Sequence, residues 1–323
     1  MELVRTTLDR LALDDRTFDL GFARRYEALQ RSVAVVGVLQ PPLARLREGD
    51  GRCQIVCGFG RAFVAQSLRH SEISALILDP ATSDADCLRL AFFDNLPHRQ
   101  FNPIERAIIL AKLGRYVSRN QLLSDYMPLL AMQPSGALLD RTLPLTRLVH
   151  GLKRAVAEGR IEEKVGALLA RLPENDQEAF GRLLEQCRPS VSVVREWAEM
   201  LTDVARRDHR PLSDLLARPE VTAVLNSTET TDAERTATLR HLFENWRYPE
   251  FAAYRRQFSE ARAALHLPPA MKLEAAPSFE SDEMRLEIRF RSEKELRHAA
   301  TVLSRWFDDP DLLNRLWQMK RQR

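Results

Sequence analysis

A glycine-containing turn near residue 58 has the residue types that bind phosphate groups. The run Gly58-Phe59-Gly60-Arg61 lies between a short apolar stretch and a helical pattern. Glycines let backbone N–H groups approach an anion, the dipole of the following helix favours negative charge, and the Arg61 guanidinium is a forked donor. The turn therefore predicts an anion site. A purely structural turn that packs Phe59 and Phe63 is the alternative, and the residues leave both interpretations open.

Oxygen-bearing side chains that could bind a ligand stand at two other places along the chain. Asp94 and Asn95 end an expected helix over residues 85–95, and Gln40 follows the end of an earlier helix at Gly37. A carboxylate and an amide supply the oxygen ligands that Mg²⁺ takes, and an amide can both donate and accept hydrogen bonds. Asp94 and Asn95 are therefore the candidate metal ligands.

Basic residues are concentrated between residues 99 and 160. That segment holds ten Lys and Arg against four acids, a net charge of +6, whereas the whole chain carries +3 and the remainder therefore −3. Such a surplus can neutralise DNA phosphates, although a solvated helical face with scattered arginines gives the same count. The candidate DNA-contacting residues are Arg115, Arg119, Ser135, Arg141, Arg147, Lys153 and Arg154.

Composition places the chain among ordinary soluble proteins of more than one domain. It has 323 residues, of which 45% are hydrophobic and 29% charged, which excludes wholesale disorder. No apolar stretch approaches the roughly 20 residues of a membrane span, and acids stand where a signal peptide would be apolar. Four scattered cysteines make a poor disulfide framework. We expect a cytoplasmic protein with free thiols and no membrane partner.

The first hundred residues mix strand and helix patterns. Helical apolar spacing covers residues 22–36, the stretch after Gly58, and residues 85–95, while short apolar runs predict strands at 43–46, 54–57 and 74–78. This alternation predicts a small α/β unit.

From Asn102 onwards the pattern becomes helical. Asn102, Pro103 and Glu105 supply a capping residue, a proline at the first helical position and an acid in the first turn. Short helices broken at prolines follow, and two of them, over residues 118–126 and 134–141, have the order and length of a helix-turn-helix. An ordinary helical hairpin is the alternative. The polar run over 227–232 indicates a linker.

The last sixty residues predict a β-β-α unit. Residues 284–290 alternate apolar and charged side chains, residues 271–274 offer a partner strand, and Ser292 caps an amphipathic helix. So small a unit cannot cover its own apolar face, which favours association with a second copy.

We therefore expect an α+β multi-domain protein. Its four segments are a small α/β domain (1–100), an all-α domain with a helix-turn-helix (101–226), a linker and helix (227–264), and a β-β-α dimerisation domain (265–323).

Three separated stretches together resemble the ParB-type partition proteins, whose ParB/sulfiredoxin-like fold is shared by nucleoid-occlusion relatives. Residues 37–42 are similar to the family's "GLxQPI", residues 58–65 occupy the place of "GERRxRAA", and residues 94–107 resemble "ENIQRxDLNPIEEA". The sequence departs from the pattern where Phe59, Gly60 and Phe63 replace an acid and two arginines, and where His98 stands at the usual arginine position. The helical segment over 145–160 and the C-terminal β-β-α unit also resemble the family.

The resemblance implies ligands and partners. In the family, CTP with Mg²⁺ closes a dimeric clamp on DNA. Carried over to this chain, the nucleotide-binding residues would be Gln40, Gly58, Gly60, Arg61, Asp94 and Asn95. The partners would be double-stranded DNA, a second copy through the C-terminal domain, and a partition ATPase.

We therefore interpret the chain as a nucleoid-associated, sequence-specific DNA-binding protein that acts in plasmid or chromosome partition or in replicon regulation. Two alternatives stay open. The first is a CTP-dependent DNA clamp with CTPase activity, for which the glycine turn departs from the family's pattern. The second is a non-catalytic adaptor without nucleotide or DNA sites.

Overall fold

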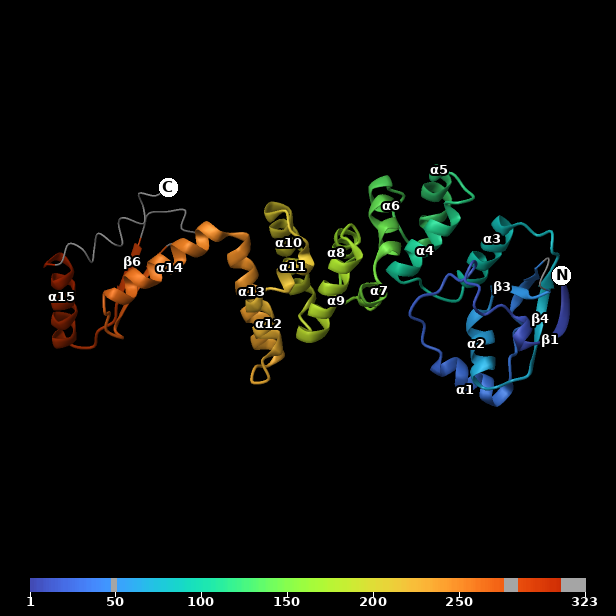
Figure 1. Ribbon diagram of the computed structural model, residues 1–323, viewed down its shortest axis with the longest axis horizontal. Coiled ribbons are helices and arrows are strands. Elements are labelled where there is room, and N and C mark those ends of the chain that lie inside the picture. Colours follow the sequence, from blue (N-terminus) through green and yellow to red (C-terminus); the bar gives the residue numbers. More distant parts are fainter. Residues whose placement is uncertain (48–50, 276–283, 309–323) are drawn as a thin grey trace. The chain divides into compact units, whose positions relative to one another are not determined.

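The computed structural model describes residues 1–47, 51–275 and 284–308 (Figure 1). The chain is an α+β protein that divides into two compact units, Met1–Ala237 and Thr238–Arg323. Each unit is described separately below. The four-segment division expected from the sequence stays a prediction.

A mixed four-stranded sheet forms the start of the N-terminal unit. Its strands are β1 (Glu2–Thr7), β2 (Leu43–Leu46), β3 (Cys53–Cys57) and β4 (Glu72–Leu78), in the order β1-β4-β2-β3. β4 pairs antiparallel with β1 and parallel with β2, and β2 pairs antiparallel with β3. The three predicted strands are confirmed, whereas β1 was not predicted.

Three helices accompany the sheet: α1 (Glu27–Val36), α2 (Phe59–Ser67) and α3 (Asp84–Asn95). α1 ends at Gly37, whose φ of +73° favours glycine. The prediction that the first helix begins at residue 22 is wrong by five residues. Ala23 has a φ of +53°, which a helix cannot contain, so the chain turns before Glu27.

One hydrophobic core runs from the sheet into the first helices of the middle segment. It extends from Leu8 to Leu139 and includes buried residues of α4 (Pro103–Leu113). Aromatic rings join the two parts, because the Phe92 ring lies 6.3 Å from that of Phe101 and 5.7 Å from that of Tyr126. The sheet and α4 are therefore packed as one body.

Short helices make up the rest of the N-terminal unit. Prolines precede several of them, as predicted: Pro173 stands directly before α9 and Pro211 before α11. The elements after α4 are α5 (Arg119–Gln121), a π-helical turn (Leu122–Tyr126), a 3-10 turn (Pro128–Leu130), α6 (Gly136–Thr142), a second 3-10 turn (Leu143–Arg147), α7 (His150–Ala157), α8 (Glu163–Leu169), α9 (Glu174–Cys187), α10 (Val191–Asp208), α11 (Leu212–Leu216) and α12 (Pro219–Asn226). The boundary between the two units falls within α13 (Asp232–Arg247). The predicted polar run begins directly after α12 ends and reaches the first residue of α13.

The C-terminal unit contains α14 (Pro249–Ala264), β5 (Met271–Ala275), β6 (Met284–Ile288) and α15 (Glu293–Asp308). β5 and β6 pair antiparallel, with Met271 opposite Ile288. The Glu295 N–H donates to Ser292 Oγ at 3.3 Å, which is the predicted helix cap. The β-β-α order is therefore confirmed. In neither unit is any described helix long and apolar enough to cross a membrane.

Candidate functional site

The glycine turn brings together residues from three segments of the chain. β3 is buried along its whole length and ends at Cys57. Gly58 follows, and its φ of +86° turns the chain into α2. Arg61 Nη1 donates to the Gln40 backbone oxygen at 3.1 Å and to Gln40 Oε1 at 3.2 Å. Arg61 Nη2 lies 3.9 Å from Asp94 Oδ2, at the end of α3. Four of the six predicted nucleotide-site residues therefore meet at this turn.

Gly60, the fifth predicted residue, is used for helix packing. A Cβ atom at Gly60 would lie 2.6 Å from Cε1 of Tyr26, which is closer than such atoms come in proteins. Gly60 is buried, and the Tyr26 ring also lies 5.5 Å from the Phe63 ring. The absence of a side chain at Gly60 thus lets Tyr26 pack against α2.

Cys57 lies directly before the turn and contacts Asp94. Burial, together with the negative charge of Asp94, raises the pKa of the Cys57 thiol to about 12. The thiol therefore stays protonated beside the carboxylate. All four cysteines are free and buried, as the expectation of free thiols requires.

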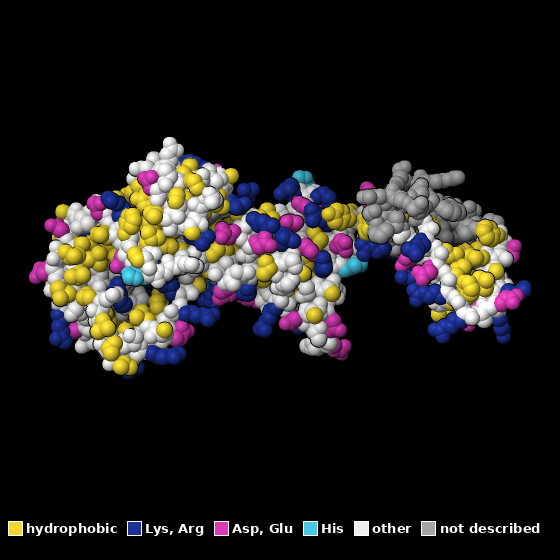
Figure 2. All heavy atoms as spheres, turned by 180° about the vertical axis from the view of Figure 1, so that it is seen from behind, with side chains coloured by type: hydrophobic (Ala, Val, Ile, Leu, Met, Phe, Trp, Pro, Cys, Tyr) yellow, Lys and Arg dark blue, Asp and Glu magenta, His cyan; other side chains and the backbone are white. Residues whose placement is uncertain are grey.

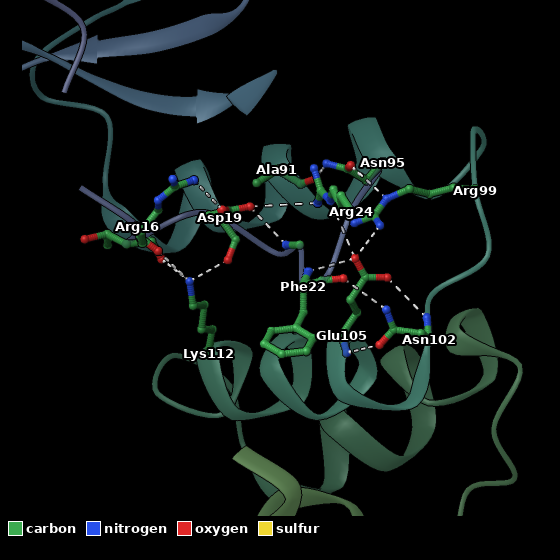
Figure 3. Close-up of polar contacts among 12 residues, drawn as sticks. Arg16, Asp19, Phe22, Arg24, Ala91, Asn95, Arg99, Asn102, Glu105 and Lys112 are labelled. Carbon is green, nitrogen blue, oxygen red and sulfur yellow. Dashed lines mark hydrogen bonds and ion pairs between the residues drawn. The ribbon is translucent and has the colours of Figure 1, made fainter. Parts of the chain in front are cut away.

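Asn95, the sixth predicted residue, makes its hydrogen bonds to Ala91 and Arg99. Its Nδ2 donates to the Ala91 backbone oxygen at 2.8 Å, and its Oδ1 accepts from Arg99 Nε at 3.2 Å (Figure 3). In the part of the chain that the structure describes, no group of three or more His, Cys, Asp or Glu side chains could hold a metal ion.

A buried carboxylate, Glu105, is the centre of a polar cluster that ties residues 16–24 to the start of α4 (Figure 3). Glu105 is only 2% exposed. It accepts from the Phe22 N–H at 3.0 Å, from Arg99 Nη1 at 2.6 Å and from the Asn102 N–H at 3.2 Å. Arg24 Nε adds an ion pair at 3.5 Å. The predicted Asn102 cap is confirmed, and Glu105 completes it as a capping box.

Lys112, which lies further along α4, binds the backbone of the same segment. Lys112 Nζ donates to the carbonyl oxygens of Arg16 at 2.7 Å, Thr17 at 2.9 Å and Asp19 at 2.7 Å (Figure 3). Burial lowers the pKa of Lys112 to about 8. These partners lie more than ninety residues away in the sequence, so no local pattern could have indicated them.

The two short helices expected to bind DNA are joined by an ion pair. Arg119 donates from both terminal nitrogens to the Asp140 carboxylate at 2.8 Å, and Arg119 Nη2 also reaches the Gly136 backbone oxygen at 3.2 Å. Ser135 caps α6, because its Oγ accepts from the Leu138 N–H at 3.3 Å. Arg119 therefore holds α5 and α6 together, and Ser135 caps the start of α6.

The other predicted DNA-contacting residues differ from Arg119 in their contacts. Over the described residues, the side chains of Arg115, Arg141, Arg147, Lys153 and Arg154 make no hydrogen bond or ion pair, and all but the half-buried Lys153 are exposed.

The acids of the same segment are already engaged. Glu105 holds Arg99, Asp140 holds Arg119, and Glu158 holds Arg160 at 2.9 Å, while Asp125 accepts from Ser124 at 2.6 Å. Figure 2 shows basic and acidic side chains intermixed over the middle of the chain. The positive surplus of residues 99–160 therefore comes mainly from the five basic side chains that have no acidic partner among the described residues.

Sequence comparisons relate the chain to proteins of chromosome partition and nucleoid occlusion, although no family model matches it. It is 27% identical over 176 residues to the probable chromosome-partitioning protein ParB of Pseudomonas putida, covering 53% of this chain and 58% of that protein. It is 22% identical over 192 residues to the nucleoid occlusion protein of Bacillus pumilus, covering 59% and 64%. The chain thus spans somewhat more than half the length of these curated relatives. The matches confirm the resemblance seen in the motifs.

Among solved structures, the chain is similar to C-terminally truncated ParB from Caulobacter crescentus. For the complex with the centromeric parS site the identity is 18% and the TM-score 0.31, over 61% of this chain and 98% of that one. For the complex with CTP-gamma-S the identity is 20% and the TM-score 0.26, over 57% and 99%.

Proposed function

We propose that this chain, a relative of the ParB and nucleoid occlusion proteins, is a sequence-specific DNA-binding protein of chromosome or plasmid partition, nucleoid occlusion or replicon regulation. The observation that carries the proposal is the set of five basic side chains between Arg115 and Arg154 that have no acidic partner among the described residues. Cations without protein partners are the groups that replace counterions on a phosphate backbone. The site of action would be the cytoplasm, at the nucleoid.

The paired residues have a different role in this proposal. Arg119 fixes α6 against α5 and Ser135 caps α6. The exposed Arg141, in the last turn of α6, has no ion-pair partner among the described residues. Phosphate contacts fix the register of a protein on the duplex, whereas base contacts read the sequence. We therefore assign Arg141, Arg147 and Arg154 to phosphate binding and α6 to the major groove.

The test compares two charge removals in the full-length protein. Arg141→Ala combined with Arg154→Ala removes two unpaired cations, whereas Arg160→Ala removes a cation that Glu158 already neutralises. DNA affinity is measured by fluorescence anisotropy over a series of salt concentrations. Because each phosphate contact contributes about 0.9 to the slope of log K against log salt, we expect the double variant to lose nearly 2 from the slope.

Retention of a genomic DNA pool, followed by sequencing of the bound fragments, tests specificity. Enrichment of one inverted repeat supports sequence-specific binding by a dimer. A double variant that binds DNA as tightly as the wild type, with the same slope as Arg160→Ala, contradicts the assignment. Uniform retention that salt abolishes leaves the adaptor alternative.

We further propose that the C-terminal unit forms the homodimer. The small core there is built on Phe258, Met271 and Trp306, yet Phe290 and Phe307 remain 52% and 75% exposed. Exposed aromatic side chains on so small a unit favour contact with a second copy. Sedimentation of the wild type and of Phe307→Ser tests this, and a wild-type monomer at micromolar concentration contradicts it. A partition ATPase stays a proposed further partner.

A further inference from the structure

We propose that the Arg61 side chain closes the glycine turn in place of a ligand. The N-terminal unit is then held in its folded form, and the chain binds DNA, without CTP or Mg²⁺. The DNA part of this inference rests on the proposed function, whereas the ligand part does not. Three features support it: the filled space over Gly58, the balanced charge of Arg61 and Asp94, and the other contacts that Gly60 and Asn95 make.

The space over Gly58 is already filled. A Cβ atom there would meet Arg61 Nη2 at 2.8 Å, Arg61 Nε at 2.9 Å and the Pro42 Cα at 3.0 Å. Glycine turns bind phosphate because nothing stands between the backbone N–H groups and the anion. Here the Arg61 guanidinium folds back over Gly58 and fills the space beside it.

The charge of the turn is balanced within the protein. Arg61 lies 3.9 Å from the Asp94 carboxylate, and Gln40, its other partner, is neutral. A nucleoside triphosphate stays anionic even with one Mg²⁺ bound, so its site needs cations in excess. The next basic residue along the chain from Asp94 that could help, Arg99, is engaged by Glu105 at 2.6 Å.

Two of the residues expected to complete a nucleotide site serve other contacts. Gly60 packs against Tyr26 and Asn95 is held by Arg99. Beside them, Phe63 presents a ring that is 42% exposed at the first turns of α2. An apolar ring therefore stands beside the turn, and with Gly60 and Asn95 engaged elsewhere the six residues do not fit CTP and Mg²⁺.

Arg61 instead supplies the links that a ligand would supply. It joins the segment after α1 through Gln40, the first turn of α2 to which it belongs, and the end of α3 through Asp94. A ligand stabilises the state it binds by contacts of this kind. In this chain those contacts are present in the protein itself.

Calorimetric titration with CTP and Mg²⁺, and thermal unfolding in their presence, test the ligand part directly. We expect no saturable heat and no shift in Tm for the wild type at millimolar CTP. Asp94→Asn, a change at a half-exposed position, removes the charge that neutralises Arg61. In that variant, and in Arg61→Ala, we expect a lower Tm than in the wild type, because each change removes a link between the three segments, and, as in the wild type, no shift of Tm on adding CTP and Mg²⁺.

Two results would overturn the proposal. Saturable CTP binding by the wild type that Arg61→Ala abolishes would place the nucleotide on Arg61 after all. Arg61→Ala and Asp94→Asn proteins with the same Tm as the wild type would show that Arg61 does not link the three segments. DNA retention is also measured with and without CTP. We expect equal retention, and a CTP-dependent change contradicts the proposal that DNA binding needs no CTP. Loss of all DNA binding would instead count against the proposed function, because the calorimetry contains no DNA.

Discussion

Replacing Glu105 should release the segment over residues 16–24 from α4. Glu105→Ala removes the acceptor for three hydrogen bonds and the counter-charge of Arg99 and Arg24. Removing one member of a buried ion pair costs about 3–5 kcal/mol because the partner charge stays buried. Part of that cost is the capping box, since losing a cap costs about 1 kcal/mol. We therefore expect Glu105→Ala to lower the free energy of unfolding by about 3–5 kcal/mol.

Urea unfolding followed by far-UV circular dichroism measures this loss, and Glu163→Ala is the matched control. Glu163 pairs with Arg106 at 3.8 Å and is about one-third exposed, so its removal should cost no more than about 1 kcal/mol. Hydrogen exchange adds a local readout, because the amides of Phe22 and Asn102 donate to Glu105 and should exchange faster in the variant. A loss no larger than that of the control, with unchanged exchange at Phe22, refutes the reasoning.

Three further predictions concern buried groups. Burial lowers the pKa of Lys112 in the folded protein to about 8, so between pH 8 and 10.5 the unfolded chain binds more protons at Lys112 than the folded chain does. The free energy of unfolding of the wild type should therefore rise with pH relative to that of Lys112→Met. Parallel pH profiles of the two proteins contradict this. Gly60→Ala should lower the free energy of unfolding by about 1–3 kcal/mol because its Cβ meets Tyr26 at 2.6 Å. Gly151→Ala, with nothing within 4 Å of its Cβ, should raise the free energy of unfolding by up to about 1 kcal/mol. Thermal unfolding compares the two variants, and equal effects would be evidence against the Tyr26 contact. Folded protein at pH 8 should react with no thiol reagent, because all four cysteines are buried and the pKa of Cys57 is about 12, and denatured protein should react at all four; fast labelling of Cys57 would contradict this.

Features with a local signal could be read from the sequence. Leu43–Leu46 was predicted with its bounds because its apolar run is short and ends in turn residues. The start of α4 followed from Asn102 and Pro103, since a cap and a first-turn proline act within one turn of the helix.

Features that depend on distant partners could not. The Phe22 N–H meets Glu105 across 83 residues, and Arg119 meets Asp140 across 21. The start of α1 was misplaced for the same reason, because the helical pattern continues back to Phe22 while the contacts of Phe22 with Glu105 and Asn102 hold the chain out of the helix. At the glycine turn the residue types were right for an anion, and only the fold shows that Asp94 and Gln40 take up the Arg61 guanidinium.

The core shared by the sheet and α4 limits how the protein can be divided. A fragment ending at residue 100 would keep Phe92 but lose Phe101 and Tyr126, the rings that cover it. It would also lose the α4 residues Ile109 and Leu110, which are fully buried in the same core. Such a fragment would expose a large aromatic surface to water and should aggregate. Dissection into working parts, or transfer of the sheet onto another protein, should therefore cut beyond Leu139.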